Sequence, residues 1–142
     1  MQENEAEIQF GKFHKEHLLK VKSGLKLFNT EMFWECHEEL EDPWMEYQGD
    51  NARLVYWAII QVATALVHVR DKNLAGAQGM IGKAQDKIKQ IELKKVETDI
   101  MNKFLSWKRF KKIVLAIPKN AKLADFDEVY SFRFSNPDKW PF

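Results

Sequence analysis

The chain has 142 residues, of which 45% are hydrophobic and 30% are charged, a composition typical of one globular domain with a sizeable core. No apolar run approaches the ~18 residues that span a bilayer, so no membrane segment is expected. The formal net charge is +1, residues 1–5 lack the features of a signal peptide, and the single cysteine excludes an internal disulfide, which together favour a cytoplasmic location.

The charge is distributed unevenly along the chain. Residues 30–50 contain eight acidic residues and no Lys or Arg, whereas residues 83–122 contain twelve Lys or Arg and four acidic residues. Two solvated faces are the simplest interpretation of this asymmetry. Opposite charges on one chain can also steer ligands or attract a second copy, so a homodimer is carried as a hypothesis.

The spacing of apolar residues predicts an all-α fold, a bundle of about five helices forming one domain over residues 1–142. We expect the first helix over residues 8–28, with His14 and His17 on its apolar side. Its inward positions recur every three or four residues, as on one face of a helix.

The second helix is expected over residues 31–42. Asn29 or Thr30 can cap its start, since short polar side chains accept hydrogen bonds from free backbone N–H groups. Pro43 cannot donate a backbone hydrogen bond, so we expect it to stop or kink the helix and to begin a short extra turn carrying Trp44.

The third helix, over residues 51–69, is apolar almost all round, which is typical of the buried centre of a bundle. A tight turn over residues 71–73 follows, and Asn73 is expected to cap a fourth helix over residues 74–91. Glycine lowers helix propensity, so the glycines inside this fourth helix predict close contact with a neighbouring helix. These are Gly76, Gly79 and Gly82.

A fifth helix is expected over residues 98–117. Its segment 107–112 mixes basic and aromatic residues, but the two kinds fall on opposite faces, so nucleic-acid binding is not expected. The remaining tail is crowded with aromatic residues, and we expect an extended arm laid across the bundle or across a second subunit. These residues are Phe126, Tyr130, Phe132, Phe134, Trp140 and Phe142.

Polar residues of the second helix gather at the edge of its apolar side. His37 lies on the core side with Glu41 one turn away, a spacing at which the two side chains can hydrogen-bond. Trp34 lies beside them, Glu38 lies further round, and Glu35 points toward solvent.

The third helix has a matching polar stripe. Its polar residues do not scatter but step by three and four along one line: Arg53, Trp57, Gln61, Thr64 and His68. An unsatisfied buried polar group costs on the order of 1–3 kcal/mol. We therefore expect this stripe to face the polar edge of the second helix.

Three functions fit such a cluster. The preferred one is binding of an unknown small molecule in a pocket between the second and third helices, walled in part by tryptophans. The second is a metal-dependent hydrolase in which His37, Glu41 and His68 hold a divalent ion. The third is a structural or adaptor module whose polar network only fixes helix register.

Other chemical motifs are weaker. Glu41 stands where the zinc-protease pattern H-E-x-x-H needs a second histidine, and the di-iron pattern E-x-x-H is also broken. His14 and His17 have a spacing that suits a metal but more often marks packed core histidines. Cys36 falls in the apolar stripe, where burial raises a thiol pKa and lowers its reactivity.

Several of these residues carry a family resemblance. Phe28-Asn29, Phe33-Trp34-Glu35-Cys36-His37-Glu38, Leu40-Glu41 and Trp44, followed by Ile60-Gln61, Ala63, Ala65, His68 and Asn73-Leu74-x-Gly76-Ala77, are similar to the signature of the family called "domain of unknown function 309". The resemblance covers roughly residues 15–92 and implies a small all-helical domain without supplying an activity. By position it implies a site made of Glu35, His37, Glu38, Glu41, Trp44, Gln61 and His68. The fifth helix and the arm, residues 98–142, lie outside it.

Overall fold

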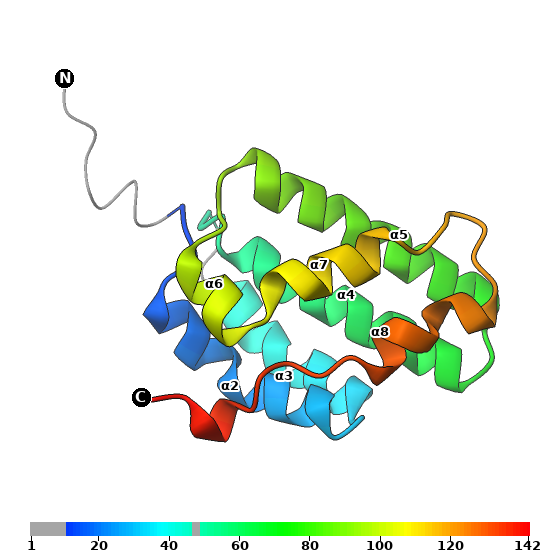
Figure 1. The fold of residues 1–142 in the computed structure, drawn as a ribbon, viewed down its shortest axis with the longest axis horizontal. Helices are drawn as coiled ribbons and strands as arrows, with labels where there is room; N and C mark the ends of the chain where they lie inside the picture. Colours follow the sequence, from blue (N-terminus) through cyan, green and yellow to red (C-terminus); the bar gives the residue numbers. More distant parts are fainter. Residues whose placement is uncertain (1–10, 47–48) are drawn as a thin grey trace.

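The protein folds as an all-α bundle, as expected from its sequence (Figure 1). The computed structural model describes residues 11–46 and 49–142, and within these ranges it contains seven α-helices, two 3-10 turns and no strand. The helices are α2 (Lys15–Asn29), α3 (Phe33–Glu46), α4 (Arg53–Arg70), α5 (Leu74–Leu93), α6 (Asp99–Phe104), α7 (Trp107–Leu115) and α8 (Asp127–Ser131), with 3-10 turns at Leu123–Phe126 and Pro137–Lys139.

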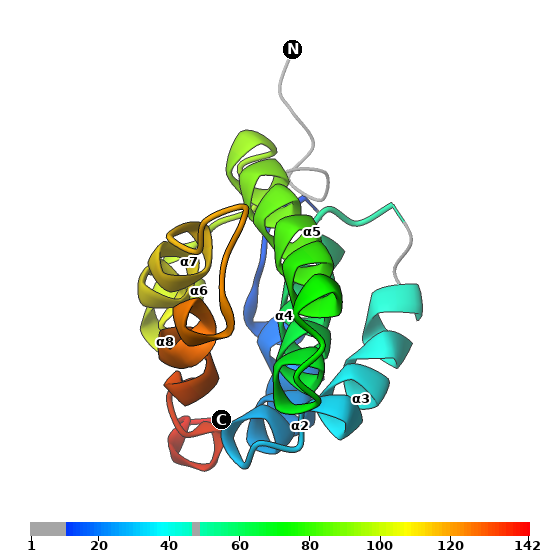
Figure 2. The ribbon, with the colours of Figure 1, turned by 90° about the vertical axis from the view of Figure 1, so that its right-hand side faces the viewer.

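Helix α4 forms the centre of the bundle, which confirms the prediction from its all-round apolar sequence. It packs extensively on α5 and on α3, and α2 packs on α3. Figure 2 shows α3 on one side of the α4–α5 pair and helices α6 to α8 on the other. Eight of its side chains are fully buried: Val55, Tyr56, Ala58, Ile59, Val62, Ala63, Ala65 and Leu66. None of the helices in the described ranges is long and apolar enough to cross a membrane.

Helix α2 begins later than predicted. Residues 11–14 are not helical, and residues 8–10 of the predicted helix lie outside the described residues. The backbone N–H of Phe13 donates to the carbonyl of Val96 at 3.0 Å, so this segment is held against the end of α5. Helix α2 starts after His14, whose own N–H donates to Nδ1 of His17 at 2.9 Å.

The predicted caps between α2 and α3 are wrong. Asn29 ends α2, and Thr30 is its C-terminal cap, with its hydroxyl donating to the carbonyls of Lys26 and Leu27. Glu31 follows with a φ of +62°, and the N–H of Met32 donates to the carbonyl of Leu27. This is a Schellman ending, in which a left-handed residue lets the next N–H groups satisfy the last helical carbonyls.

Helix α3 continues through Pro43 to Glu46, so the predicted stop at this residue is wrong. A proline inside a helix removes one N–H donor. Here Pro43 is buried, as is Leu40, and the indole of Trp44 packs at 5.2 Å from that of Trp57 on α4. This packing keeps the last turn of α3 helical and holds Trp44 on the α4 side.

The predicted fifth helix is divided into α6 and α7. Ser106, between them, has a φ of +51°, a left-handed conformation that ends one helix before the other begins. The change of direction buries Met101 of α6 together with Trp107 and Phe110 of α7. A single straight helix would present its apolar residues along one line, whereas the break lets both segments turn theirs inward.

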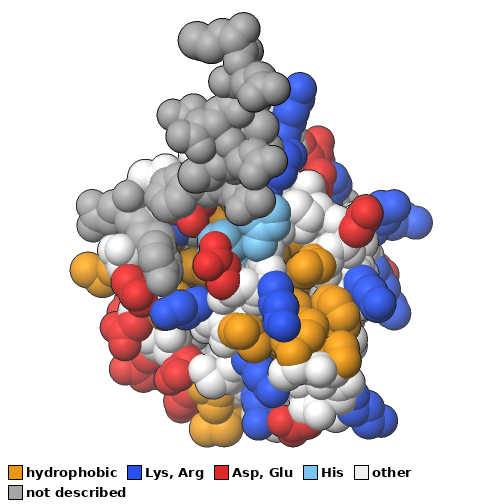
Figure 3. All heavy atoms as spheres, turned by 90° about the vertical axis from the view of Figure 1, so that its left-hand side faces the viewer, with side chains coloured by type: hydrophobic (Ala, Val, Ile, Leu, Met, Phe, Trp, Pro, Cys, Tyr) orange, Lys and Arg blue, Asp and Glu red, His pale blue; other side chains and the backbone are white. Residues whose placement is uncertain are grey.

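The aromatic tail lies across the bundle, as expected, but it contains helix α8 and two 3-10 turns besides extended segments. Asn29 of α2 fastens it, because its side chain accepts from the N–H of Phe134 at 2.9 Å and donates to the carbonyl of Phe134 at 3.0 Å. Phe132, Phe134 and Trp140 are buried. In Figure 3, hydrophobic side chains also gather at the surface, on the face that includes α6 and the C-terminal end.

Close helix contact occurs at Gly24 rather than at most of the predicted glycines. A Cβ added at Gly79 or Gly82 would meet no atom within 4 Å, so the prediction is wrong for these two residues. The prediction of close helix contact is correct for Gly76, where a Cβ would lie 2.8 Å from Cγ of His68 on α4. At Gly24 a Cβ would lie 2.6 Å from Cγ and Cδ2 of the buried Leu40 on α3.

We predict that Gly24→Ala lowers the free energy of unfolding by about 1–3 kcal/mol, because the added methyl overpacks the contact between α2 and α3. Gly79→Ala is the matched control and should raise it by roughly 0.5–1 kcal/mol through helix propensity alone. Urea denaturation followed by circular dichroism measures both. Equal gains in the two variants would contradict the packing described here.

Candidate functional site

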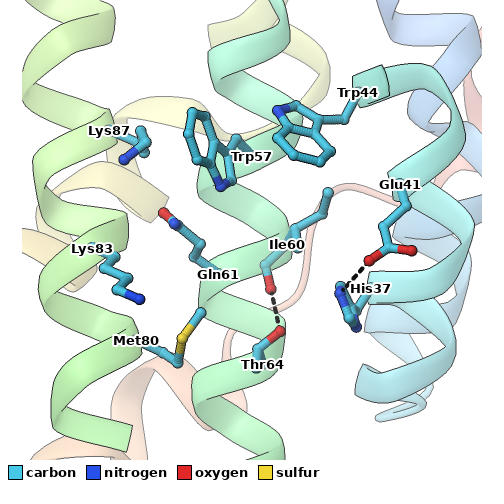
Figure 4. A pocket seen from close by; sticks show the side chains of 10 residues that line it. All are labelled: His37, Glu41, Trp44, Trp57, Ile60, Gln61, Thr64, Met80, Lys83 and Lys87. Atoms are coloured by element: carbon cyan, nitrogen blue, oxygen red, sulfur yellow. Dashed lines mark hydrogen bonds and ion pairs between the residues drawn. The ribbon is translucent and has the colours of Figure 1, made fainter. Parts of the chain in front are cut away.

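A pocket of about 470 Å³ opens over α4, with α3 along one side and α5 along the other (Figure 4). Three helices therefore build it, rather than the two predicted from sequence. It is lined by His37, Glu41 and Trp44 of α3, Trp57, Ile60, Gln61 and Thr64 of α4, and Met80, Lys83 and Lys87 of α5.

His37 and Glu41 form the polar edge of the α3 wall. Nε2 of His37 lies 2.8 Å from Oε1 of Glu41, the i, i+4 contact predicted from the sequence. When His37 is neutral and Nε2 donates, its Nδ1 is a bare acceptor, and this atom is buried without a hydrogen-bond partner in the described protein. The ring is held edge-on by Trp34, with centroids 4.7 Å apart.

Gln61 provides a buried amide on the α4 floor. Its side chain is 4% exposed, and its Oε1 has no hydrogen-bond partner among the described residues. Thr64, one turn on, donates its hydroxyl to the carbonyl of Ile60 at 2.9 Å within the same helix. The floor therefore offers, at Gln61, an acceptor oxygen to which no described residue donates.

Two indoles close one end of the pocket. Trp44 and Trp57 approach with centroids 5.2 Å apart, and Nε1 of Trp44 is buried without a partner in the described protein. The guanidinium carbon of Arg53 lies 5.1 Å from the ring centroid of Trp44. Continuation of α3 through Pro43 is what brings Trp44 to this position.

The α5 wall contributes cations that sequence reasoning missed. Lys83 and Lys87 are one helical turn apart, and Met80 lies one turn before them, all facing the pocket. The ammonium of Lys87 lies 4.1 Å from the centroid of Trp57, and its side chain is only 12% exposed. The 80, 83, 87 spacing marks a second line beside the apolar stripe of α5 and could have indicated this wall.

The structure brings four of the predicted site residues together and places three elsewhere. His37, Glu41, Trp44 and Gln61 line the pocket, whereas Glu35, Glu38 and His68 do not. Both glutamates are exposed on α3, because a rotation of about 100° per residue carries them away from His37. Nδ1 of His68 lies 3.2 Å from the amide nitrogen of Asn73, at the start of α5. Asn73 also caps α5 through the N–H of Gly76, as predicted.

The predicted metal ligands do not assemble. Within the described ranges, no three side chains of His, Cys, Asp or Glu come together in an arrangement that could hold a metal ion. His37 and Glu41 are paired, but His68 is engaged with Asn73 and lies outside the pocket lining. The His14 and His17 pair is unsuited as well, because both ring nitrogens of His17 are occupied.

His17 belongs to a buried clasp between α2 and the start of α4. Its Nδ1 accepts from the N–H of His14, so Nε2 carries the hydrogen and donates to Oδ2 of Asp50 at 2.9 Å. Asp50 is 3% exposed, and its other oxygen accepts from the N–H of Ala52 at 3.0 Å. Every polar atom of this clasp is used, which marks it as architecture.

Cys36 is fully buried on α3, as predicted from its place in the apolar stripe. Burial, aided by the negative charge of Glu39, raises the pKa of its thiol to about 12. The thiolate is thus almost absent at neutral pH, and the residue is a core side chain rather than a nucleophile.

We predict that the two histidine–carboxylate pairs differ in their effect on stability. Asp50→Asn should lower the free energy of unfolding by about 1–3 kcal/mol, because an amide cannot accept from both His17 and Ala52 and leaves a buried donor unpaired. Glu41→Gln should change it by less than about 0.5 kcal/mol, as for an exposed i, i+4 pair. Chemical denaturation of both variants measures these changes. A larger loss of stability in Glu41→Gln than in Asp50→Asn would contradict the assignment of the His17–Asp50 pair as the structural one.

Comparison with known proteins finds a family that is similar to part of this chain. Residues 21–80 match the family described as "Domain of unknown function (DUF309)", which confirms the resemblance seen in the motifs. The chain is also similar to the uncharacterized protein YpuF of Bacillus subtilis (strain 168), with 41% identity over 69 residues. That match covers 48% of this chain and 38% of YpuF. No solved structure matches the chain. The matched region contains α3, α4 and the start of α5, including Met80, but ends before Lys83.

Proposed function

We propose that this domain binds a small molecule in the pocket between α3, α4 and α5. The observation that carries the proposal is Gln61, a 4% exposed residue that lines the pocket and whose Oε1 has no donor among the described residues. A buried acceptor without a partner destabilises the folded protein. A ligand that donates a hydrogen bond to this oxygen would remove that cost.

Neighbouring atoms support the same interpretation. Nδ1 of His37 and Nε1 of Trp44 are also buried without partners in the described protein, and both side chains line the pocket. One is an acceptor in the neutral ring and the other a donor, so the walls present both kinds of group. Small-molecule sites typically have mostly apolar walls and a small number of well-placed polar groups.

The alternative of a purely structural network has less support. A structural network stabilises a core when its members are satisfied. Among the described residues no hydrogen bond joins α3 to α4 across this pocket: the bond of His37 stays within α3, and that of Thr64 stays within α4. The hydrolase alternative is not retained, because its three proposed metal ligands do not meet.

We predict that Gln61→Met raises the free energy of unfolding of the ligand-free protein by about 1 kcal/mol, because it removes a buried unpaired oxygen. Gln85→Met is the matched control on α5. Its Nε2 donates to the carbonyls of Val114 and Ile117 at 3.0 and 2.8 Å, so its loss should destabilise. A clear loss of stability in Gln61→Met would show that this amide is structurally satisfied in solution.

We also predict that flat aromatic probes enter the pocket. Naphthalene-2-carboxylate and naphthalene-2-carboxamide would be titrated into ¹⁵N-labelled full-length chain, with the indole N–H signals observed by NMR. The signals of Trp44 and Trp57 should shift. That of Trp107 should not, because it is buried elsewhere and donates to Glu97. If neither probe moves the two pocket signals at millimolar concentration, the proposed function is wrong.

A further inference from the structure

We infer that the ligand carries an oxyanion, a carboxylate or a phosphate, attached to a flat apolar group, and that Lys87 and Lys83 bind this oxyanion. This inference rests on the proposed function and names the class of molecule that the pocket accepts. It comes from the α5 wall, two of whose pocket residues lie beyond the segment matched by the family.

Lys87 is a largely buried cation whose ion pair with Asp86 is long and lies at the surface. Its side chain is 12% exposed, and the carboxylate of Asp86 lies 3.8 Å from Nζ, beyond hydrogen-bond distance and 63% exposed. Removing an ammonium group from water is costly unless it is paired. The contact with the ring of Trp57 compensates part of this cost and holds the cation at the pocket wall.

Lys83 adds a second positive charge to the pocket wall that contains Lys87. Lys83 lies one turn before Lys87 on the same face of α5, and both line the pocket. Figure 4 shows the two lysines on the α5 side and Glu41 on the opposite α3 side, with the floor of α4 between them. An anionic group is therefore attracted toward α5 and repelled from Glu41, which fixes the direction in which a ligand lies.

The remaining walls suit a flat apolar body. Trp57, Trp44, Ile60 and Met80 supply most of the apolar lining. Indole faces stack on planar rings, and a thioether adapts to their edges. The amide of Gln61 on the floor then lies within the same pocket as the cations and can accept a hydrogen bond from a polar atom of that body.

Three probes that share one ring test the inference: naphthalene-2-carboxylate, 2-naphthyl phosphate and the neutral naphthalene-2-carboxamide. Affinities are measured from the Trp44 and Trp57 indole shifts of the full-length chain. Both anions should bind at least about tenfold more tightly than the carboxamide, as expected for a charge-assisted hydrogen bond. The tighter of the two anions identifies the oxyanion as carboxylate or phosphate.

Substitutions of the lysines test whether these side chains cause the preference for anionic probes. The double variant Lys83→Met/Lys87→Met keeps the aliphatic stems but removes both cations and should abolish the preference for anions, whereas Lys87→Arg should retain most of it. Lys89→Met is the control, because Lys89 is exposed on the same helix and lies outside the pocket lining. Equal binding of carboxylate and carboxamide by the wild type would overturn this inference and leave the pocket intact as a ligand site. An anion preference that survives in the Lys83→Met/Lys87→Met variant would also overturn it. Absence of binding by all three probes would contradict both this inference and the proposed function.

Discussion

The burial of α4 constrains everything else in this protein. Because neighbouring elements cover the helix on nearly every side, each polar side chain on it must either find a partner or line a cavity. Trp57, Gln61 and Thr64 fall on one line of the helix between α3 and α5, and the pocket lies over that line. The position of the site is thus a consequence of the packing of the core.

The buried polar groups of this protein are of two kinds, those that have hydrogen-bond partners and those that do not. In the clasp of His17 and Asp50 each buried atom has a partner, so the clasp fixes α2 against the start of α4. In the pocket, Gln61 and the second nitrogen of His37 remain unmatched by the described protein. Natural sites often lower the stability of the free protein in this way, because groups arranged for a ligand are not arranged for one another.

Much of the fold could be predicted from periodicity. Helices α4 and α5, the Asn73 cap, the burial of Cys36 and the pairing of His37 with Glu41 all follow from spacing along single helices. The polar line of α4 could be predicted as well, since three and four residue steps define one face. These features are local, or depend on one helix being buried.

Other features depend on contacts between elements that spacing does not reveal. Helix α3 passes through Pro43 because packing against α4 outweighs one lost hydrogen bond. The endings of α2, α4 and α5 place Glu31, Lys72 and Lys95 in the left-handed region, where sequence reasoning expects glycine. Lys83 and Lys87 belong to the site only because α5 lies beside α4 in the hairpin, so their helix had to be placed before their role could be seen.

The most direct test of the central claim is a double-mutant cycle on unfolding between His37→Leu and Gln61→Met, which removes polar groups from facing helices. No hydrogen bond between described residues joins α3 to α4 across the pocket, so the two changes should be additive within about 0.5 kcal/mol. A coupling energy above roughly 1 kcal/mol would show that α3 and α4 are joined there in solution. In that case the cluster is part of the architecture, and the pocket is not held open for a ligand.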